Sequence, residues 1–110
     1  HDRLVTPAIL DLARREALIV DVGKEGFGTS TAQADIDAML VEHASKGLHV
    51  VRLKGGDPTL FGRLDEEIAA VEAAGIAFSI VPGITAASAA VAAIGQSLTS
   101  RGRNAAVRFV

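Results

Sequence analysis

The sequence predicts an α/β protein with a mostly parallel sheet and alternating helices. Apolar runs of strand length, rich in β-branched residues, occur at 17–22, 48–53, 76–81 and 105–110. Segments with apolar residues at helical spacing separate these runs. Strands that alternate with helices are typical of βαβ units, so we expect a parallel sheet.

The first two helices are defined by their end signals. Pro7 opens a helix over residues 7–15, at a first-turn position where proline is tolerated. Ser30 and Gln33 predict a capping box at the start of the second helix. Gly47 ends that helix, as glycine does where the chain turns left-handed.

The later helices follow the same logic. A helix is predicted over residues 65–74, and Gly75 stops it. Its inward-facing residues are predicted to be Ile68, Val71 and Ala74. Thr85 caps a helix of small residues that runs to about residue 94.

Two unusual turns follow consecutive predicted strands. The stretch GGDP at residues 55–58 follows the second strand, and PGIT at residues 82–85 follows the third. Ligands of open α/β sheets bind beyond the carboxyl ends of the strands. Glycine has no Cβ, so backbone can approach a ligand closely there. We therefore expect both turns to belong to one ligand site.

Composition narrows the class of protein. A chain of 110 residues is the size of one domain, here residues 1–110, and a net charge of −2 argues against a nucleic-acid surface. Cysteine is absent and the three histidines are scattered, so no metal site is expected. No run of about 18 apolar residues predicts a membrane span. The first residues, HDRLVTPAIL, do not look like a signal peptide, so we expect a cytoplasmic protein.

Five ordered motifs carry a resemblance to a known family. They are DRLV, VGK, RLKGGDPTLFGR, VPGITAA and LTSRG, in sequence order over nearly the whole chain. Together they resemble uroporphyrinogen-III C-methyltransferase, a tetrapyrrole methylase. The resemblance implies part of a two-lobed fold, mostly the first lobe and the start of the second.

The resemblance also implies an activity. The family transfers methyl groups from S-adenosylmethionine to carbons of uroporphyrinogen III, giving precorrin-2 on the way to siroheme and cobalamin. It implies a homodimer and a cofactor cleft between the two lobes.

Site residues are carried over by motif. The cofactor-binding positions are Gly55, Gly56, Asp57, Leu60, Thr85 and Ala86. The catalytic positions are Asp2, as proton acceptor, and Lys24, as proton donor. The substrate-binding positions are Arg3, Arg63, Glu66 and Arg101. Arginine is suited to a substrate with many carboxylates, because its guanidinium binds them in a bidentate way.

The sequence departs from the family pattern mainly near the substrate positions. Thr59 replaces an aromatic residue, Leu64 and Asp65 replace two glycines, and Ser100 replaces a histidine. A carboxylate at Asp65 would repel a polyanionic substrate. These changes bear on substrate binding more than on cofactor binding.

Plainer interpretations stay open beside the functional ones. The GGDP stretch also fits an ordinary strand-to-helix turn. Asp2 and Lys24 also fit exposed charged residues, and Arg63 with Glu66 fits a surface ion pair. For the whole chain, the alternatives are a methylase of another precorrin, a small-molecule-binding module, or a folded fragment without catalysis.

Overall fold

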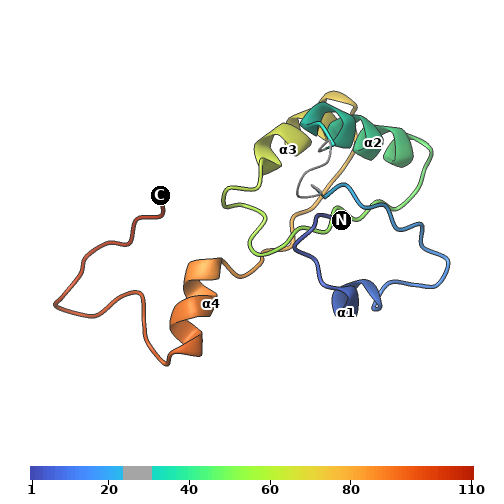
Figure 1. Cartoon of the computed structure of the whole chain (residues 1–110). Helices are drawn as coiled ribbons and strands as arrows, with labels where there is room; N and C mark the ends of the chain where they lie inside the picture. The colour runs from blue at the N-terminus through green and yellow to red at the C-terminus, as the bar shows by residue number, and fades with distance from the viewer. Residues whose placement is uncertain (24–30) are drawn as a thin grey trace.

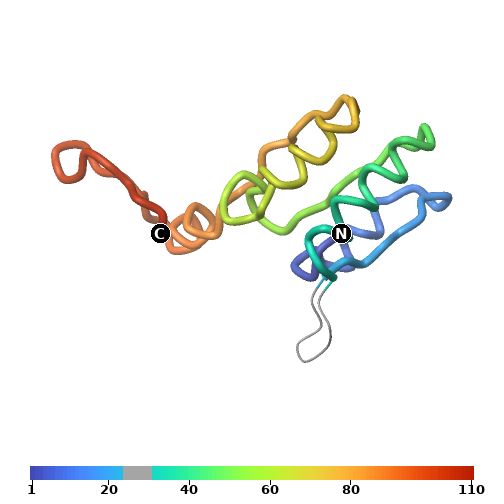
Figure 2. The backbone as a smooth tube through the Cα atoms, turned by 90° about the horizontal axis from the view of Figure 1, so that it is seen from above, coloured from blue at the N-terminus to red at the C-terminus, as the bar shows by residue number. Residues whose placement is uncertain are grey.

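A pair of helices forms the best-packed part of the molecule. The computed structural model describes residues 1–23 and 31–110, and in it α2 (Gln33–Ser45) lies beside α3 (Leu64–Ala73) (Figures 1 and 2). On α2, Ile36 is buried, and Met39 and Leu40 are half-buried. This is the face that the helical spacing predicts.

The inner face of α3 differs from the prediction. Ile68 and Val71 are half-buried as expected, but Ala74 is exposed, because it is the C-cap residue beyond the last helical turn. The most buried residue of α3 is instead Glu67, at 3% exposure. A carboxylate is rarely buried without partners, and its partners are described below.

The helix ends are partly as predicted. Gly47 and Gly75 take left-handed φ angles of 79° and 68° directly after α2 and α3. Ser30 of the predicted capping box lies outside the described residues, and Ala32 holds the N-cap position of α2.

The first helix differs from its prediction, and the last helix begins where it was predicted. Helix α1 (Pro7–Leu10) is shorter than the predicted 7–15, because residues 11–20 are all exposed and nothing packs against them to stabilise so short a helix. Helix α4 (Ala86–Ala93) begins as predicted, with Thr85 at the N-cap and its Oγ1 accepting the Ala87 N–H at 3.2 Å.

The predicted sheet does not form in the described parts of the chain. None of the four predicted strands is paired as a strand over residues 1–23 and 31–110. One large apolar side chain in each of them is between 67% and 96% exposed: Leu18, Val51, Val81 and Val110. A strand of a parallel sheet is covered on both faces, so these runs lack the burial that such a sheet requires.

The predicted strands at 17–22 and 48–53 stay unpaired because a very short segment, residues 1–3, lies next to both of them. The backbone N–H of His1 donates to the Val20 carbonyl at 2.8 Å, and Val22 N–H donates to the His1 carbonyl at 3.0 Å. On the other side, Asp2 N–H donates to the Leu53 carbonyl at 3.2 Å. His1 thus bonds to two residues of the neighbouring segment, Val20 and Val22, as one residue does in a pair of parallel strands. Residues 1–3 are too few to pair the neighbouring segments along their length.

The molecule is therefore open and elongated. Its radius of gyration is 16.8 Å, whereas a compact domain of this length has about 13 Å. Helix α4 and the C-terminal segment extend away from the helix pair (Figures 1 and 2). In the ranges that the structure describes, no helix is both long enough and apolar enough to span a bilayer.

Candidate functional site

The two unusual turns lie against each other. A Cβ built on Gly83 would stand 2.2 Å from the Gly56 carbonyl oxygen and 3.0 Å from the Asp57 Cα. A Cβ on Gly56 would meet the Ile84 carbonyl oxygen at 3.5 Å. Two backbones this close leave no room for a side chain at Gly83. The structure thus brings together two turns that are more than twenty residues apart in the sequence.

A hollow of about 490 Å³ opens beside these turns. Its lining includes all six residues predicted for the cofactor: Gly55, Gly56, Asp57, Leu60, Thr85 and Ala86. The remaining lining residues were not predicted: Leu4, Phe61, Ile84, Ala87 and Phe109. They are apolar, and no local sequence signal separates such residues from ordinary core residues. The hollow therefore has mostly apolar walls with a few polar groups, which is the usual character of a small-molecule site.

The Asp57 side chain is held in a fixed position at the hollow. Its Oδ1 accepts from the Thr59 hydroxyl at 2.7 Å and from the Thr59 N–H at 2.9 Å. These two hydrogen bonds, the hydroxyl one first, lower the pKa of Asp57 from its ordinary value. The carboxylate is consequently charged throughout the neutral range. Thr59 departs from the family pattern, yet its two hydrogen bonds to Asp57 order the GGDP turn.

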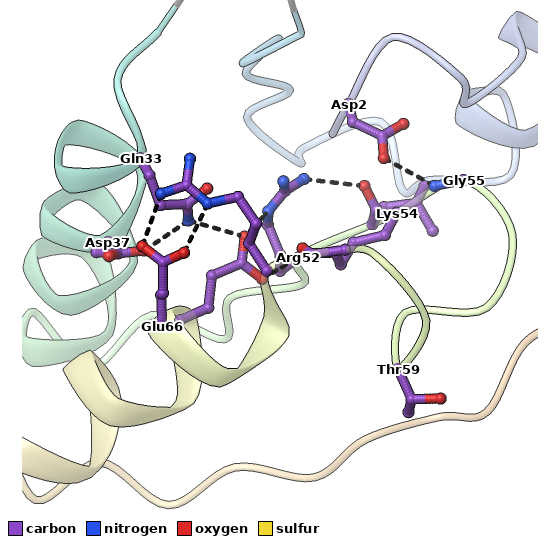
Figure 3. Close-up of polar contacts among 12 residues, drawn as sticks. Asp2, Gln33, Asp37, Arg52, Lys54, Gly55, Thr59 and Glu66 are labelled. Atoms are coloured by element: carbon purple, nitrogen blue, oxygen red, sulfur yellow. Dashed lines mark hydrogen bonds and ion pairs between the residues drawn. The ribbon is translucent and has the colours of Figure 1, made fainter. Parts of the chain in front are cut away.

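Asp2 holds the same turn through hydrogen bonds to the backbone. Its Oδ2 accepts the Gly55 N–H at 2.9 Å (Figure 3). Its Oδ1 accepts the Leu4 N–H, also at 2.9 Å. Gly55 and Leu4 both line the hollow. The half-buried Asp2 is therefore next to the hollow and anchors two parts of its wall. Lys24, its predicted catalytic partner, lies outside the described residues.

Arg63 and Glu66 bind each other. Arg63 Nε donates to Glu66 Oε1 at 2.6 Å and Arg63 Nη2 to Glu66 Oε2 at 2.7 Å, a bidentate pair. The hydrogen bonds lower the pKa of Glu66 and raise that of Arg63. Asp37 of α2 and Asp65 add to the negative surroundings of Arg63. The surface ion pair that the sequence allowed is present, and neither residue lines the hollow.

The other two predicted substrate residues are exposed. Arg3 follows Asp2, and its backbone packs against Gly23, where a Cβ would meet the Arg3 nitrogen at 2.7 Å. Arg101 lies in the turn after Ser100 and does not line the hollow. The structure does not gather the four predicted substrate residues around one point.

A buried cluster of charges was not predicted. Glu67 Oε1 accepts from Arg52 Nε at 2.9 Å, and Glu67 Oε2 accepts from Lys54 Nζ at 2.7 Å. Gln33 Nε2 is at 3.5 Å from Glu67 Oε1 and also donates to Asp37 at 2.8 Å (Figure 3). The sequence feature that could have indicated this cluster is the pair Arg52 and Lys54 at the end of an apolar run. Residues two apart share one face of an extended chain, and buried cations there require an anion. Over residues 1–23 and 31–110, no group of three or more acidic or histidine side chains could hold a metal ion.

Comparisons with known proteins place the chain in a family. The sequence profile of the "Tetrapyrrole (Corrin/Porphyrin) Methylases" matches residues 1–108. The siroheme synthases of Hahella chejuensis and Baumannia cicadellinicola are 53% and 54% identical to this chain over 110 residues. The chain belongs to the tetrapyrrole methylase family. It spans 24% of the length of these two relatives.

Solved structures agree. The crystal structure of uroporphyrin-III-C-methyltransferase from Thermus thermophilus is 46% identical, with a TM-score of 0.76 over 93% of this chain and 42% of its own. The same enzyme complexed with S-adenyl homocysteine has a TM-score of 0.70 and 39% identity over 96% of this chain and 42% of its own. The predicted fold family is thus confirmed, although the parallel sheet is not formed in the described residues.

Proposed function

We propose that the complete gene product carrying residues 1–110 is a methyltransferase that uses S-adenosylmethionine to methylate carbons of uroporphyrinogen III, giving precorrin-2. One observation supports this most directly. Residues of two distant turns, 55–60 and 85–86, line a single hollow. Membership of the tetrapyrrole methylases and the likeness to a structure complexed with S-adenyl homocysteine support the same assignment.

The hollow fits the chemistry of such a cofactor. Its volume of about 490 Å³ lies within the ordinary range for small-molecule sites. Glycine backbone at 55 and 56 can face a ligand closely, and Leu60 and Ile84 offer apolar contact to a nucleobase. When bound, S-adenosylmethionine would supply a methyl group on a sulfonium sulfur, to be taken up in line by a pyrrole carbon as the bond to sulfur breaks and the neutral thioether leaves.

Residues of the chain would then position the cofactor and deprotonate the methylated tetrapyrrole. Asp57, kept charged by Thr59, attracts the positively charged parts of the cofactor. Methylation of a pyrrole carbon leaves a cation that must lose a proton, and a carboxylate beside the reacting centre can accept it. We assign that role to Asp2, whose carboxylate accepts the Gly55 N–H. Lys24 is the proposed proton donor.

Substrate recognition is assigned to the exposed cations. Uroporphyrinogen III carries several carboxylates, which guanidinium groups bind in a bidentate way. Arg3 and Arg101 are exposed and suited to this role. Arg63 would have to exchange Glu66 for a substrate carboxylate. The departures from the family pattern at Leu64, Asp65 and Ser100 favour a second candidate, methylation of another precorrin with the same cofactor site. A homodimer is proposed from the family resemblance, and the cytoplasm is proposed as its setting.

Methyl transfer can be measured directly. The complete gene product is incubated with S-adenosylmethionine and uroporphyrinogen III without oxygen, and the tetrapyrrole is weighed by mass spectrometry. We expect the gain of one and then two methyl groups. A folded protein that binds S-adenosylhomocysteine but transfers nothing would support the second candidate. A folded protein that does neither would contradict the proposal.

A further inference from the structure

The buried Lys54 lies outside the hollow, yet it is bonded to the segment that forms one wall. We propose that Lys54 is a positioning residue that fixes the 55–63 segment in its ligand-binding shape. The inference rests on the proposed function, since it concerns the same cofactor site.

Lys54 closes the segment into a loop from inside. Its side chain is 7% exposed, and its Nζ donates to the Gly62 carbonyl oxygen and to Glu67 Oε2. Lys54 directly precedes Gly55, so the ammonium group joins the start of the segment to its end. Five residues of the hollow lie between these two points: Gly55, Gly56, Asp57, Leu60 and Phe61.

The end of the segment needs such a restraint. Phe61 and Arg63, on either side of Gly62, have left-handed φ angles of 54° and 53°. Residues with side chains disfavour this region, and they stay in it only where surrounding contacts hold them. Gly62 is also tightly enclosed, since a Cβ there would stand 2.9 Å from the Pro58 carbonyl oxygen and 3.2 Å from Lys54 Cε. The bond from Lys54 to the Gly62 carbonyl oxygen lies between the two strained residues.

Arg52 offers a matched comparison within the same cluster. It donates to Glu67 Oε1 at 2.9 Å and to the Leu53 carbonyl at 3.2 Å, and no contact with the 55–63 segment is among its hydrogen bonds. Replacing either cation leaves Glu67 with one partner fewer, so both changes should lower stability. Only the loss of Lys54 removes the restraint on the segment.

The test uses the complete gene product and titration with S-adenosylhomocysteine by calorimetry, with the thermal midpoint recorded in parallel. We expect Lys54→Met to weaken binding by about tenfold or more, the scale on which lost positioning acts. Arg52→Met should keep the affinity within about twofold, because the hydrogen bonds of Arg52 do not reach the 55–63 segment, even if its midpoint falls. Wild-type affinity in folded Lys54→Met, or an equal loss in both variants, would overturn the proposal.

A second variant covers the case in which Lys54→Met does not fold. Gly62→Ala keeps every charge, but its Cβ must displace Lys54 or Pro58. It should weaken binding and also lower the midpoint, because a backbone oxygen lies 2.9 Å from the new Cβ. Unchanged affinity in the folded variant would contradict the proposal.

Hydrogen exchange separates this inference from the proposed function. If the wild-type protein does not bind S-adenosylhomocysteine, the proposed function fails. Amide exchange over residues 55–63 still tests the role of Lys54. It should be faster in Lys54→Met, or in Gly62→Ala where that variant is used, and unchanged in Arg52→Met. Equal exchange in the variants would overturn the inference.

Discussion

At the residue scale, the observed anchoring by Asp2 and its proposed role as proton acceptor fall on one carboxylate. Both of its oxygens accept backbone N–H groups, from Leu4 and Gly55, and both of those residues line the hollow. A carboxylate has about four lone-pair sites, so it can make these bonds and still accept a proton. Anchoring and proton acceptance are therefore compatible.

Asp2→Asn separates the two roles. The asparagine oxygen can replace one acceptor, while its NH2 group cannot accept from a backbone N–H. We expect kcat for methyl transfer to fall by about 10²-fold or more through loss of the base. Binding of S-adenosylhomocysteine should weaken far less. A variant with weakened binding but unchanged kcat would show that Asp2 is an anchor alone.

At the element scale, helix α4 begins at the hollow. Thr85 and Ala86 line the hollow, and the Thr85 hydroxyl caps the first turn. Thr85→Ala should lower the free energy of unfolding by about 0.5–2 kcal/mol, the usual cost of losing such a cap. Urea denaturation of the complete gene product measures this, with Thr85→Ser as the control that keeps the hydroxyl. Equal losses in both variants would contradict the capping role.

Elements with local end signals were predicted well from the sequence. Helices α2, α3 and α4 begin and end within a few residues of the positions that Gly47, Gly75 and Thr85 indicate, because caps act within one turn. The strands failed, because a strand depends on neighbours that local sequence does not specify. Here His1 bonds to the 20–22 segment, and Asp2 bonds to Leu53.

The candidate site shows the same division. The glycines and Thr85 were predictable by motif and turn chemistry. Phe109 and Leu4 come from the two ends of the chain, and only tertiary structure brings them to the hollow. Glu67 was missed because apolar periodicity assigned the inner face of α3 to Ile68 and Val71.

At the scale of the whole molecule, the described chain has little core and much exposed apolar surface. Ile36 and Glu67 are the buried residues within 1–23 and 31–110, and the radius of gyration is 16.8 Å. Contiguous exposed apolar surface favours association. The relatives it matches are about four times as long.

Residues 1–110 expressed without further sequence should therefore associate and have little methyltransferase activity. Sedimentation velocity would measure the association, and the methyl-transfer assay would measure the activity, with the complete gene product as the control. A monomer with cooperative unfolding and full activity would contradict this expectation.

The central claim is that the turns at 55–57 and 83–86 form one cofactor site, and Gly83→Ala tests it most directly. The added Cβ would stand 2.2 Å from the Gly56 carbonyl oxygen, so the turns must separate. Gly47→Ala is the control: its φ of 79° makes alanine unfavourable, but nothing lies within 4 Å of the new Cβ. Titration with S-adenosylhomocysteine should show binding in the wild type and the control and severe loss in Gly83→Ala. Wild-type affinity in folded Gly83→Ala would contradict the account.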